Sequence, residues 1–236
     1  MSKGKLFLIP APLGGDDPDK VFPPYNKKII EEINHYIVEN EKSARKFIKM
    51  IAPGKKQPEL VIFQLNKHDK SQGIEEFIKP LLEGKDMGLI SEAGLPAIAD
   101  PGSLIVNLAH KNHIKIIPLV GPSSIMMALM ASGLNGQEFS FHGYLPKDTG
   151  DLKRKIKSLE KESQKTGKSQ IFIETPYRNP KLFESLLKNL NPDTMLSIAV
   201  DLSLPTEEIH SFPVKEWKNK KINLHKRPAV FIFQAY

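Results

Sequence analysis

The protein has 236 residues and no cysteine, so disulfides, thiolate metal sites and a cysteine nucleophile are excluded. The 34 basic and 27 acidic residues give a net charge of +7, which permits a polyanionic partner without requiring one. No apolar run approaches the ~20 residues of a membrane helix. Pro10 and Pro12 interrupt any signal-peptide core, so we expect a cytoplasmic protein. The histidines are scattered without metal-ligand spacing, and no metal is expected.

Short apolar runs alternate with amphipathic segments in the first half of the chain. The predicted strands are Lys5–Ile9, Tyr36–Val38, Leu60–Gln64, Met87–Ile90 and Lys115–Leu119. The predicted helices are Asn26–His35, Ser43–Ile51, Ile74–Leu82 and Gly102–Asn112. Strands that alternate with helices predict a mostly parallel sheet covered on both faces.

The second half has a different rhythm. Its predicted strands are Phe139–Leu145, Gln170–Glu174, Met195–Val200, Glu207–Phe212 and Ala229–Gln234. Its predicted helices are Ser123–Ala131, Asp151–Lys165 and Pro180–Leu190. The last strands follow one another without an ordinary helix between them, which indicates a mixed sheet. We therefore predict an α/β fold of two domains, with a mostly parallel sheet in residues 1–119 and a mixed sheet in residues 120–236.

Two stretches of the first half follow predicted strands, and ligands of open α/β sheets bind beyond the carboxyl ends of strands. Residues 91–102 read SEAGLPAIADPG, in which Gly94 allows a close backbone approach. A rigid connection capped by Asp100 explains this stretch equally well. Residues 121–124 read GPSS and open a helix, where amides and hydroxyls could hold a carboxylate or a ribose. An ordinary helix start is the alternative.

Three further stretches follow strands of the second half. In FHGYLP (141–146), strand alternation places His142 and Tyr144 on the same side, and His142 could be a base or a buried structural residue. ETPYR (174–178) brings together a carboxylate, an aromatic ring and a guanidinium. These groups could form the lip of a site, or an ion pair that fixes the turn. The third stretch is DLSLPTEE (201–208).

In this order and spacing, these stretches resemble the tetrapyrrole-methylase-type (class III) S-adenosylmethionine (SAM)-dependent methyltransferases. Within that family they are most similar to the small-subunit ribosomal RNA cytidine 2′-O-methyltransferases. The matching stretches are LFLIPAPLG (6–14) for the first strand and TPIGN loop, SEAGLPAIADPG (91–102) for SDAGTPxISDPG, GPSS (121–124) for GPSA, ASGL (131–134) for ASGL, FHGYLP (141–146) for FxGFLP, ETPYR (174–178) for YESPHR, and DLSLPTEE (201–208) for ELTKxxEE.

The resemblance implies a two-domain α/β fold, SAM in the cleft between the domains, and a homodimer. It further implies that ribosomal RNA or the small ribosomal subunit is the partner. The residues that it implies for cofactor binding are Pro12, Ser91, Ala93, Gly94, Gly121, Pro122, Ser123, Ser124, Tyr144, Leu145 and Pro146.

The presumed acceptor side departs from the family pattern. The branch carries AEDTRxTRKLL where residues 38–48 read VENEKSARKFI, so its Asp-Thr-Arg core is Asn-Glu-Lys at 40–42. A HEHNE-like stretch reads NKHDK at 66–70. A ribose hydroxyl is a weak nucleophile and benefits from a base. The candidate bases are Glu39, His142 and Glu174, and the candidate phosphate-binding residues are Lys42, Arg45 and Arg178. For each of these residues, a surface ion pair is the alternative.

Three functions are compatible with the sequence. We expect an RNA ribose methyltransferase, and the basic segments 42–56 and 215–227 favour RNA. A methylase of a small molecule such as a tetrapyrrole is the second possibility. Relatives of that kind usually carry a GxGPGD first loop, whereas residues 11–15 read APLGG. The third is an RNA- or ribosome-binding protein that keeps the fold without turnover.

Overall fold

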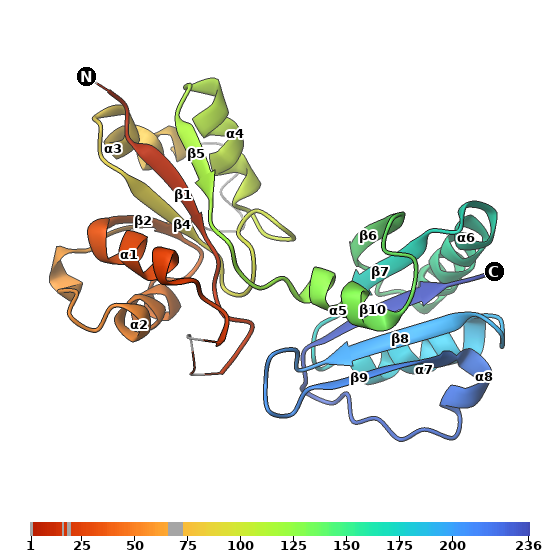
Figure 1. The fold of residues 1–236 in the computed structure, drawn as a ribbon. Coiled ribbons are helices and arrows are strands. Elements are labelled where there is room, and N and C mark those ends of the chain that lie inside the picture. Colours follow the sequence, from red (N-terminus) through yellow and green to blue (C-terminus); the bar gives the residue numbers. More distant parts are fainter. Residues whose placement is uncertain (1, 16, 18–19, 66–72) are drawn as a thin grey trace. The chain divides into compact units, whose positions relative to one another are not determined.

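The computed structural model describes residues 2–15, 17, 20–65 and 73–236 (Figure 1). The contacts divide the chain into two compact units, Met1–Ser123 and Ser124–Tyr236. Each unit builds a five-stranded sheet from its described residues. The HEHNE-like stretch at 66–70 lies outside the described residues. No helix in the described part of the chain is long and apolar enough to span a bilayer.

The sheet of the first unit has the order β3-β2-β4-β1-β5, and every neighbouring pair is parallel. The prediction of a mostly parallel sheet is confirmed. Its strands are β1 (Lys5–Ile9), β2 (His35–Val38), β3 (Val61–Gln64), β4 (Met87–Ile90) and β5 (Lys115–Pro118). The helical segments are α1 (Pro24–Glu32), α2 (Glu41–Ile51), the 3-10 turn η2 (Gln57–Glu59), the 3-10 turn η3 (Ile74–Ile78), α3 (Lys79–Leu82) and α4 (Ser103–Lys111).

Helices cover both faces of this sheet because successive strand residues point to opposite sides. Leu6 packs in the core that contains residues of α3 and α4, whereas Phe7 packs in the core that contains residues of α1 and α2. In α2, Ala44, Phe47 and Ile48 are buried at helical spacing. Because helices cover both faces, a ligand can reach this sheet at its carboxyl edge, where the loops after the strands lie.

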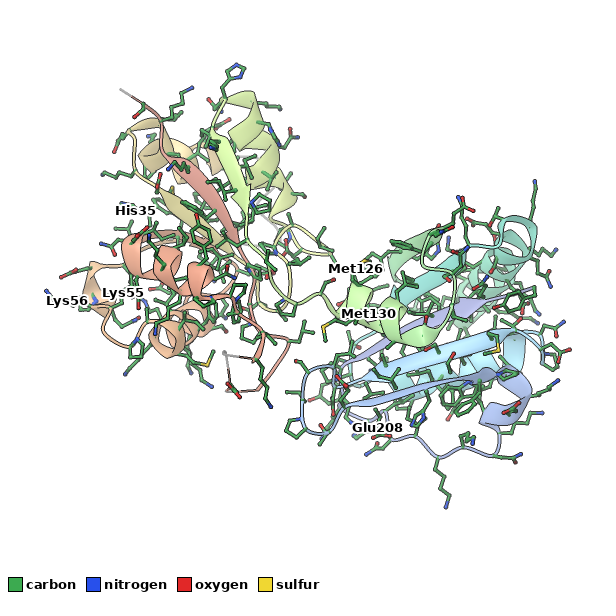
Figure 2. All side chains as sticks on the ribbon, in the orientation of Figure 1. His35, Lys55, Lys56, Met126, Met130 and Glu208 are labelled. Carbon is green, nitrogen blue, oxygen red and sulfur yellow. The ribbon has the colours of Figure 1, made fainter. Side chains whose placement is uncertain are left out.

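Two predicted helices of the first half are wrong in detail. The helix predicted to reach His35 ends at Glu32, and His35 opens β2 (Figure 2). The Tyr36 hydroxyl donates to the carbonyls of Ile30 and Ile33, which fixes the turn between the two elements. The helix predicted for residues 74–82 is a 3-10 turn followed by one α-turn. Pro80 has no N–H to donate to a carbonyl of the preceding turn, so one continuous helix is disfavoured.

The second unit contains the predicted mixed sheet, with the order β6-β7-β10-β8-β9. β6 and β7 are parallel, and the other neighbouring pairs are antiparallel. The strands are β6 (Phe139–Tyr144), β7 (Ser169–Ile173), β8 (Met195–Val200), β9 (Glu208–Pro213) and β10 (Ala229–Gln234). The helices are α5 (Ser124–Ser132), α6 (Thr149–Thr166), α7 (Asn179–Asn189) and α8 (Val214–Trp217).

One hydrophobic core joins α6 and α7 to this mixed sheet, and α5 contacts β8, β9 and β10. Phe172, Phe231 and Phe233 are fully buried in that core. The short helix α8, which the sequence analysis did not predict, places Trp217 beneath β8, where its indole N–H donates to the Leu196 carbonyl at 3.0 Å. The indole therefore buries a large apolar surface with its polar atom satisfied.

Candidate functional site

The carboxyl edge of the parallel sheet gathers three loops of the first unit. β1 and β4 are neighbours at the centre of the sheet. From β1 the chain proceeds to β2 on one side, and from β4 it proceeds to β5 on the other. Such a switch point is where ligands bind in open α/β sheets.

Backbone contacts join these loops. The Ala11 N–H donates to the Gly94 carbonyl at 2.8 Å, and the Gly94 N–H donates back to the Ala11 carbonyl at 3.0 Å. The Ser91 hydroxyl donates to the same Gly94 carbonyl at 2.8 Å. The loop after β1 and the loop after β4 are therefore braced against each other.

The loop after β5 lies against the loop after β1 at Gly121. A Cβ atom built on Gly121 would lie 2.3 Å from the Cβ atom of Pro10, which is far below any real contact. Only glycine allows the two backbones to approach this closely. The GPSS stretch thus places its backbone directly against Pro10 of the first loop.

The loop between β4 and α4 holds a strained backbone. Ala97 and Ala99 have φ values of 66° and 61°, in the left-handed region that disfavours alanine. The Asp100 carboxylate accepts from the Ala97 N–H at 2.7 Å and from the Gly102 N–H at 2.8 Å. Asp100 therefore fixes the loop, but it does not cap α4, whose N-cap is Gly102 and has no side-chain cap hydrogen bond. Backbone strain of this kind clusters at functional sites.

A small pocket of about 50 Å³ opens at this edge, between the loops and α2. Among the described residues that line it, Glu92 is the one charged side chain. Asn40 forms part of the wall and caps α2, because its Oδ1 accepts from the Ser43 N–H at 3.0 Å. The lining residues are Ala11, Pro12, Val38, Asn40, Ser43, Ala44, Phe47, Ile90, Ser91 and Glu92. Because the lining side chains are mostly small and uncharged, the pocket suits part of a neutral or weakly charged ligand.

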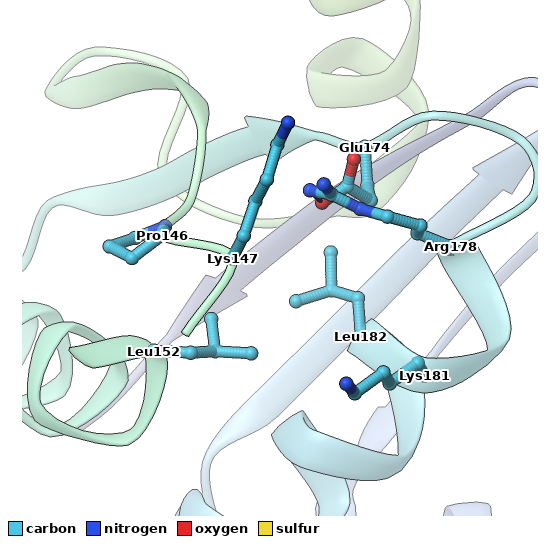
Figure 3. A pocket seen from close by; sticks show the side chains of 7 residues that line it. All are labelled: Pro146, Lys147, Leu152, Glu174, Arg178, Lys181 and Leu182. Carbon is cyan, nitrogen blue, oxygen red and sulfur yellow. Dashed lines mark hydrogen bonds and ion pairs between the residues drawn. The ribbon is translucent and has the colours of Figure 1, made fainter. Parts of the chain in front are cut away.

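A second pocket lies within the second unit, at the carboxyl ends of the parallel strands β6 and β7 (Figure 3). The FHGYLP and ETPYR stretches follow or end these two strands, so strand pairing brings the two motifs together. The pocket has a volume of about 80 Å³ and is lined by Pro146, Lys147, Leu152, Glu174, Arg178, Lys181 and Leu182.

An ion pair orders one wall of this second pocket. The Glu174 side chain is only 5% exposed and accepts a hydrogen bond from the Arg178 guanidinium. Its other oxygen accepts from the Thr175 N–H at 2.6 Å. Both carboxylate oxygens are therefore engaged within the turn.

A profile described as "Tetrapyrrole (Corrin/Porphyrin) Methylases" matches residues 26–218. The chain belongs to the tetrapyrrole methylase family. A crystal structure of the methyltransferase CobJ shares the fold, with a TM-score of 0.63 at 15% identity over 98% of this chain and 95% of that chain. This confirms the predicted α/β architecture.

Two curated relatives carry the name "Ribosomal RNA small subunit methyltransferase I". The protein from Vibrio cholerae is 28% identical over 98% of this chain and 77% of its own length. The protein from Halalkalibacterium halodurans is 31% identical over 87% of this chain and 67% of its own length. As a tetrapyrrole methylase, the chain is a methyltransferase that uses SAM as its methyl donor.

The residues that the sequence analysis assigned to the cofactor fall in both units of this methylase. Pro12 and Ser91 line the first pocket, and Ala93 is exposed beside it. Pro122 and Ser123 follow the close approach at Gly121, and Ser124 opens α5. In the second unit, Tyr144 is exposed, Leu145 is buried, and Pro146 lines the second pocket.

His142 lies apart from the second pocket. Its Nε2 is 2.7 Å from the Gln170 Oε1, near the amino end of β7, whereas the pocket follows the carboxyl end. The predicted alternation along β6 is wrong here, because the pairing register with β7 shifts between Phe141 and Tyr144. Gly143, with a φ of 62°, absorbs the irregularity.

The candidate acceptor residues of the first unit occupy different environments. Glu39 follows β2 and is half-buried beside the first pocket. Arg45 donates to Glu41 at 2.8 Å and to the Gln57 carbonyl at 2.6 Å, contacts that belong to a structural residue. Lys42 is exposed on α2 and forms no ion pair with any described residue.

Sequence reasoning missed two lysines of the second pocket. Lys147 directly follows the FHGYLP stretch, and Lys181 lies in the first turn of α7. The sequence feature that could have indicated them is their position, since each lies in the segment that follows a predicted strand. Tertiary structure was needed to show that they share one pocket with Arg178.

Proposed function

We propose that this methyltransferase acts on small-subunit ribosomal RNA and transfers a methyl group to a ribose 2′-hydroxyl. The observation that carries the proposal is similarity over almost the whole chain to methyltransferases named for that RNA. The cationic pocket of the second unit supports it, because phosphates bind to lysine and arginine side chains.

The three joined loops of the first unit fit the cofactor. Ser91, Ala93 and Gly94 supply backbone groups and a hydroxyl at the carboxyl edge of the sheet, and Gly121 lets the loop after β5 pack directly against the loop after β1. We assign SAM binding to these residues together with Pro12 and residues 122–124. The contribution of residues 144–146 stays a prediction. Bound SAM supplies a methyl group already activated on a positively charged sulfur.

The remaining chemistry consists of alignment and proton removal. The methyl group leaves the sulfur for the ribose oxygen, and the hydroxyl proton passes to a base. Glu39 is the candidate base of the first unit, where it follows β2 between Val38 and Asn40, which line the first pocket. Both oxygens of Glu174 are engaged, and His142 is hydrogen-bonded to Gln170. We therefore assign Glu174 to positioning Arg178.

We further propose a homodimer that acts in the cytoplasm, where small ribosomal subunits assemble. Met126 and Met130 expose apolar side chains on α5, which supports a protein partner for that helix. Light scattering of the purified protein at micromolar concentration measures the mass. A mass of one chain would contradict the dimer.

Transfer of a labelled methyl group from SAM to undermodified small ribosomal subunits tests the function. We expect label in the RNA at ribose positions, detected as linkages that resist alkaline hydrolysis. Glu39→Gln is expected to lower the transfer rate at least 100-fold while S-adenosylhomocysteine still binds in a calorimetric titration.

Two results would contradict the proposal. Label in a metabolite extract and none in RNA would favour the small-molecule methylase. Salt-dependent RNA binding without any methyl transfer would favour a binding protein that has lost turnover.

A further inference from the structure

The pocket at the ends of β6 and β7 has the shape and charge of an anion site. Lys147 reaches it from the loop before α6, and Arg178 and Lys181 reach it from the start of α7 (Figure 3). Leu152 and Leu182, both buried, form an apolar floor between these cations. Lys147 and Arg178 therefore lie toward one end of a partly enclosed apolar surface, and Lys181 lies toward the other (Figure 3).

Two of these cations have no counter-ion. Lys147 and Lys181 form no ion pair with any residue that the structure describes. Elsewhere in this unit, Arg154 pairs with Asp151, and Lys157 pairs with Glu160. Like charges that gather without partners repel each other, and a bound anion would remove that repulsion.

The guanidinium of Arg178 is held in one orientation. Its Nη2 donates to Glu174, which is itself fixed by the Thr175 N–H. No described residue accepts from its Nε or Nη1. A guanidinium that is anchored at one edge can present its other donors to a phosphate without losing further side-chain entropy.

An exposed aromatic ring lies on the same turn. Tyr177 is 71% exposed, the Lys226 ammonium lies 5.8 Å from its ring centroid, and the His225 ring meets it edge-on at 6.4 Å. The Lys226 N–H donates to the Pro176 carbonyl at 3.1 Å, which ties the two loops together. Exposed aromatic rings beside cations are typical of sites for single-stranded RNA, where bases stack and phosphates pair.

We propose that this surface binds a single-stranded segment of the RNA substrate, with backbone phosphates held by Lys147 and Arg178 at one end of the pocket and by Lys181 at the other, and a base stacked on Tyr177. The inference rests on the proposed function for the identity of the RNA. It adds which part of the chain holds the RNA. It also names the two groups of the RNA that are recognised, a backbone phosphate and a base.

The test compares matched pairs of lysine substitutions by fluorescence anisotropy with a labelled single-stranded fragment of small-subunit RNA. The Lys147→Ala/Lys181→Ala variant is expected to lose about tenfold or more in affinity and to show a salt slope shallower by about 1.4, at about 0.7 for each lost contact with a single strand. The control Lys161→Ala/Lys165→Ala removes the same charge from exposed positions further along α6, and less than a twofold loss is expected.

The stacking contact is measured separately. Tyr177→Ala is expected to weaken binding about fivefold or more without changing the salt slope, because stacking releases no counterions. Tyr177→Phe keeps the ring and should retain wild-type affinity.

Three outcomes would overturn the inference. The two lysine pairs could lose the same affinity, which would reduce the pocket to part of a general positive field. The Lys147→Ala/Lys181→Ala variant could lose S-adenosylhomocysteine binding, which would assign the pocket to the cofactor. Inorganic phosphate at micromolar concentration could displace the RNA, which would indicate a site for a free anion.

Methyl transfer by the unsubstituted protein separates this inference from the proposed function. If the unsubstituted protein methylates subunits and the pocket variant binds RNA normally, only the further inference fails. If the pocket variant loses RNA binding but the unsubstituted protein transfers no methyl group, the inference stands and the proposed function fails.

Discussion

The first and second pockets described above occupy equivalent places in their sheets and differ in charge. Both lie beyond the carboxyl ends of parallel strands. Among described lining residues, the first has Glu92 as its charged side chain, whereas the second has Glu174 and three cations. The edge of a sheet thus fixes where a ligand binds, and the residues that follow the strands decide which ligand.

The two pockets are also held together by different forces. Backbone hydrogen bonds between Ala11 and Gly94 and the close approach of Gly121 to Pro10 shape the first unit's loops. A buried ion pair between Glu174 and Arg178 shapes the second. The first pocket should therefore be sensitive to added volume, and the second to the loss of a charge.

The largest expected effect follows from removing Arg178. Arg178→Met leaves the buried Glu174 carboxylate without its cation, which costs about 3–5 kcal/mol of unfolding free energy. Urea unfolding of Arg178→Met and the unsubstituted protein measures this loss of unfolding free energy. The double variant Glu174→Gln/Arg178→Met should recover most of the loss. Arg154→Met breaks the exposed pair with Asp151 and should cost less than about 1 kcal/mol. Equal losses for the two arginines would contradict a buried pair.

Added volume in the first unit comes next. Gly121→Ala places a methyl group against Pro10, which should cost about 1–3 kcal/mol. The same shift should weaken S-adenosylhomocysteine binding in a calorimetric titration. Gly54→Ala is the matched control, since a Cβ there meets nothing within 4 Å. Unchanged cofactor affinity in Gly121→Ala would show that the loop after β5 does not shape the site.

The cap of α2 has a smaller effect. Asn40→Ala removes the acceptor of the Ser43 N–H and should cost about 1 kcal/mol of unfolding free energy. Asn40→Asp should stay within a few tenths of the wild-type value, because aspartate caps equally well. A full loss in Asn40→Asp would show that the side-chain amide has a role besides capping.

The smallest effect concerns His35, which opens β2 at the amino edge of the first sheet, whereas the first pocket lies at the carboxyl edge (Figure 2). Burial and the Lys85 ammonium lower its pKa, and Glu83 opposes them. Because the unfolded chain takes up the proton first, stability is complete above about pH 6.5 and falls as the pH drops through that value. His35→Gln should show a smaller fall in Tm between pH 7.5 and 5.5, with RNA and cofactor affinities unchanged. Equal falls in Tm for His35→Gln and the unsubstituted protein would contradict the lowered pKa of His35.

The sequence predicted most elements because their periodicities were clean. β1, β4, β8 and β10 occupy the ranges that their apolar runs predicted. The ends of helices were predicted less accurately. His35 belongs to a strand, and Pro80 interrupts the helix predicted for residues 74–82. α8 escaped prediction because four residues carry too little periodicity, and its stability comes from burying Trp217.

The sequence by itself determined the fold class, the family and the stretches that follow the strands, because these depend on local pattern and on the order of motifs. Only the tertiary structure decided which side chains meet. Lys147 and Arg178 are 31 residues apart, and the parallel pairing of β6 with β7 brings them to one pocket. The same pairing turns His142 toward Gln170. Contacts between distant residues depend on strand register, which no local pattern fixes.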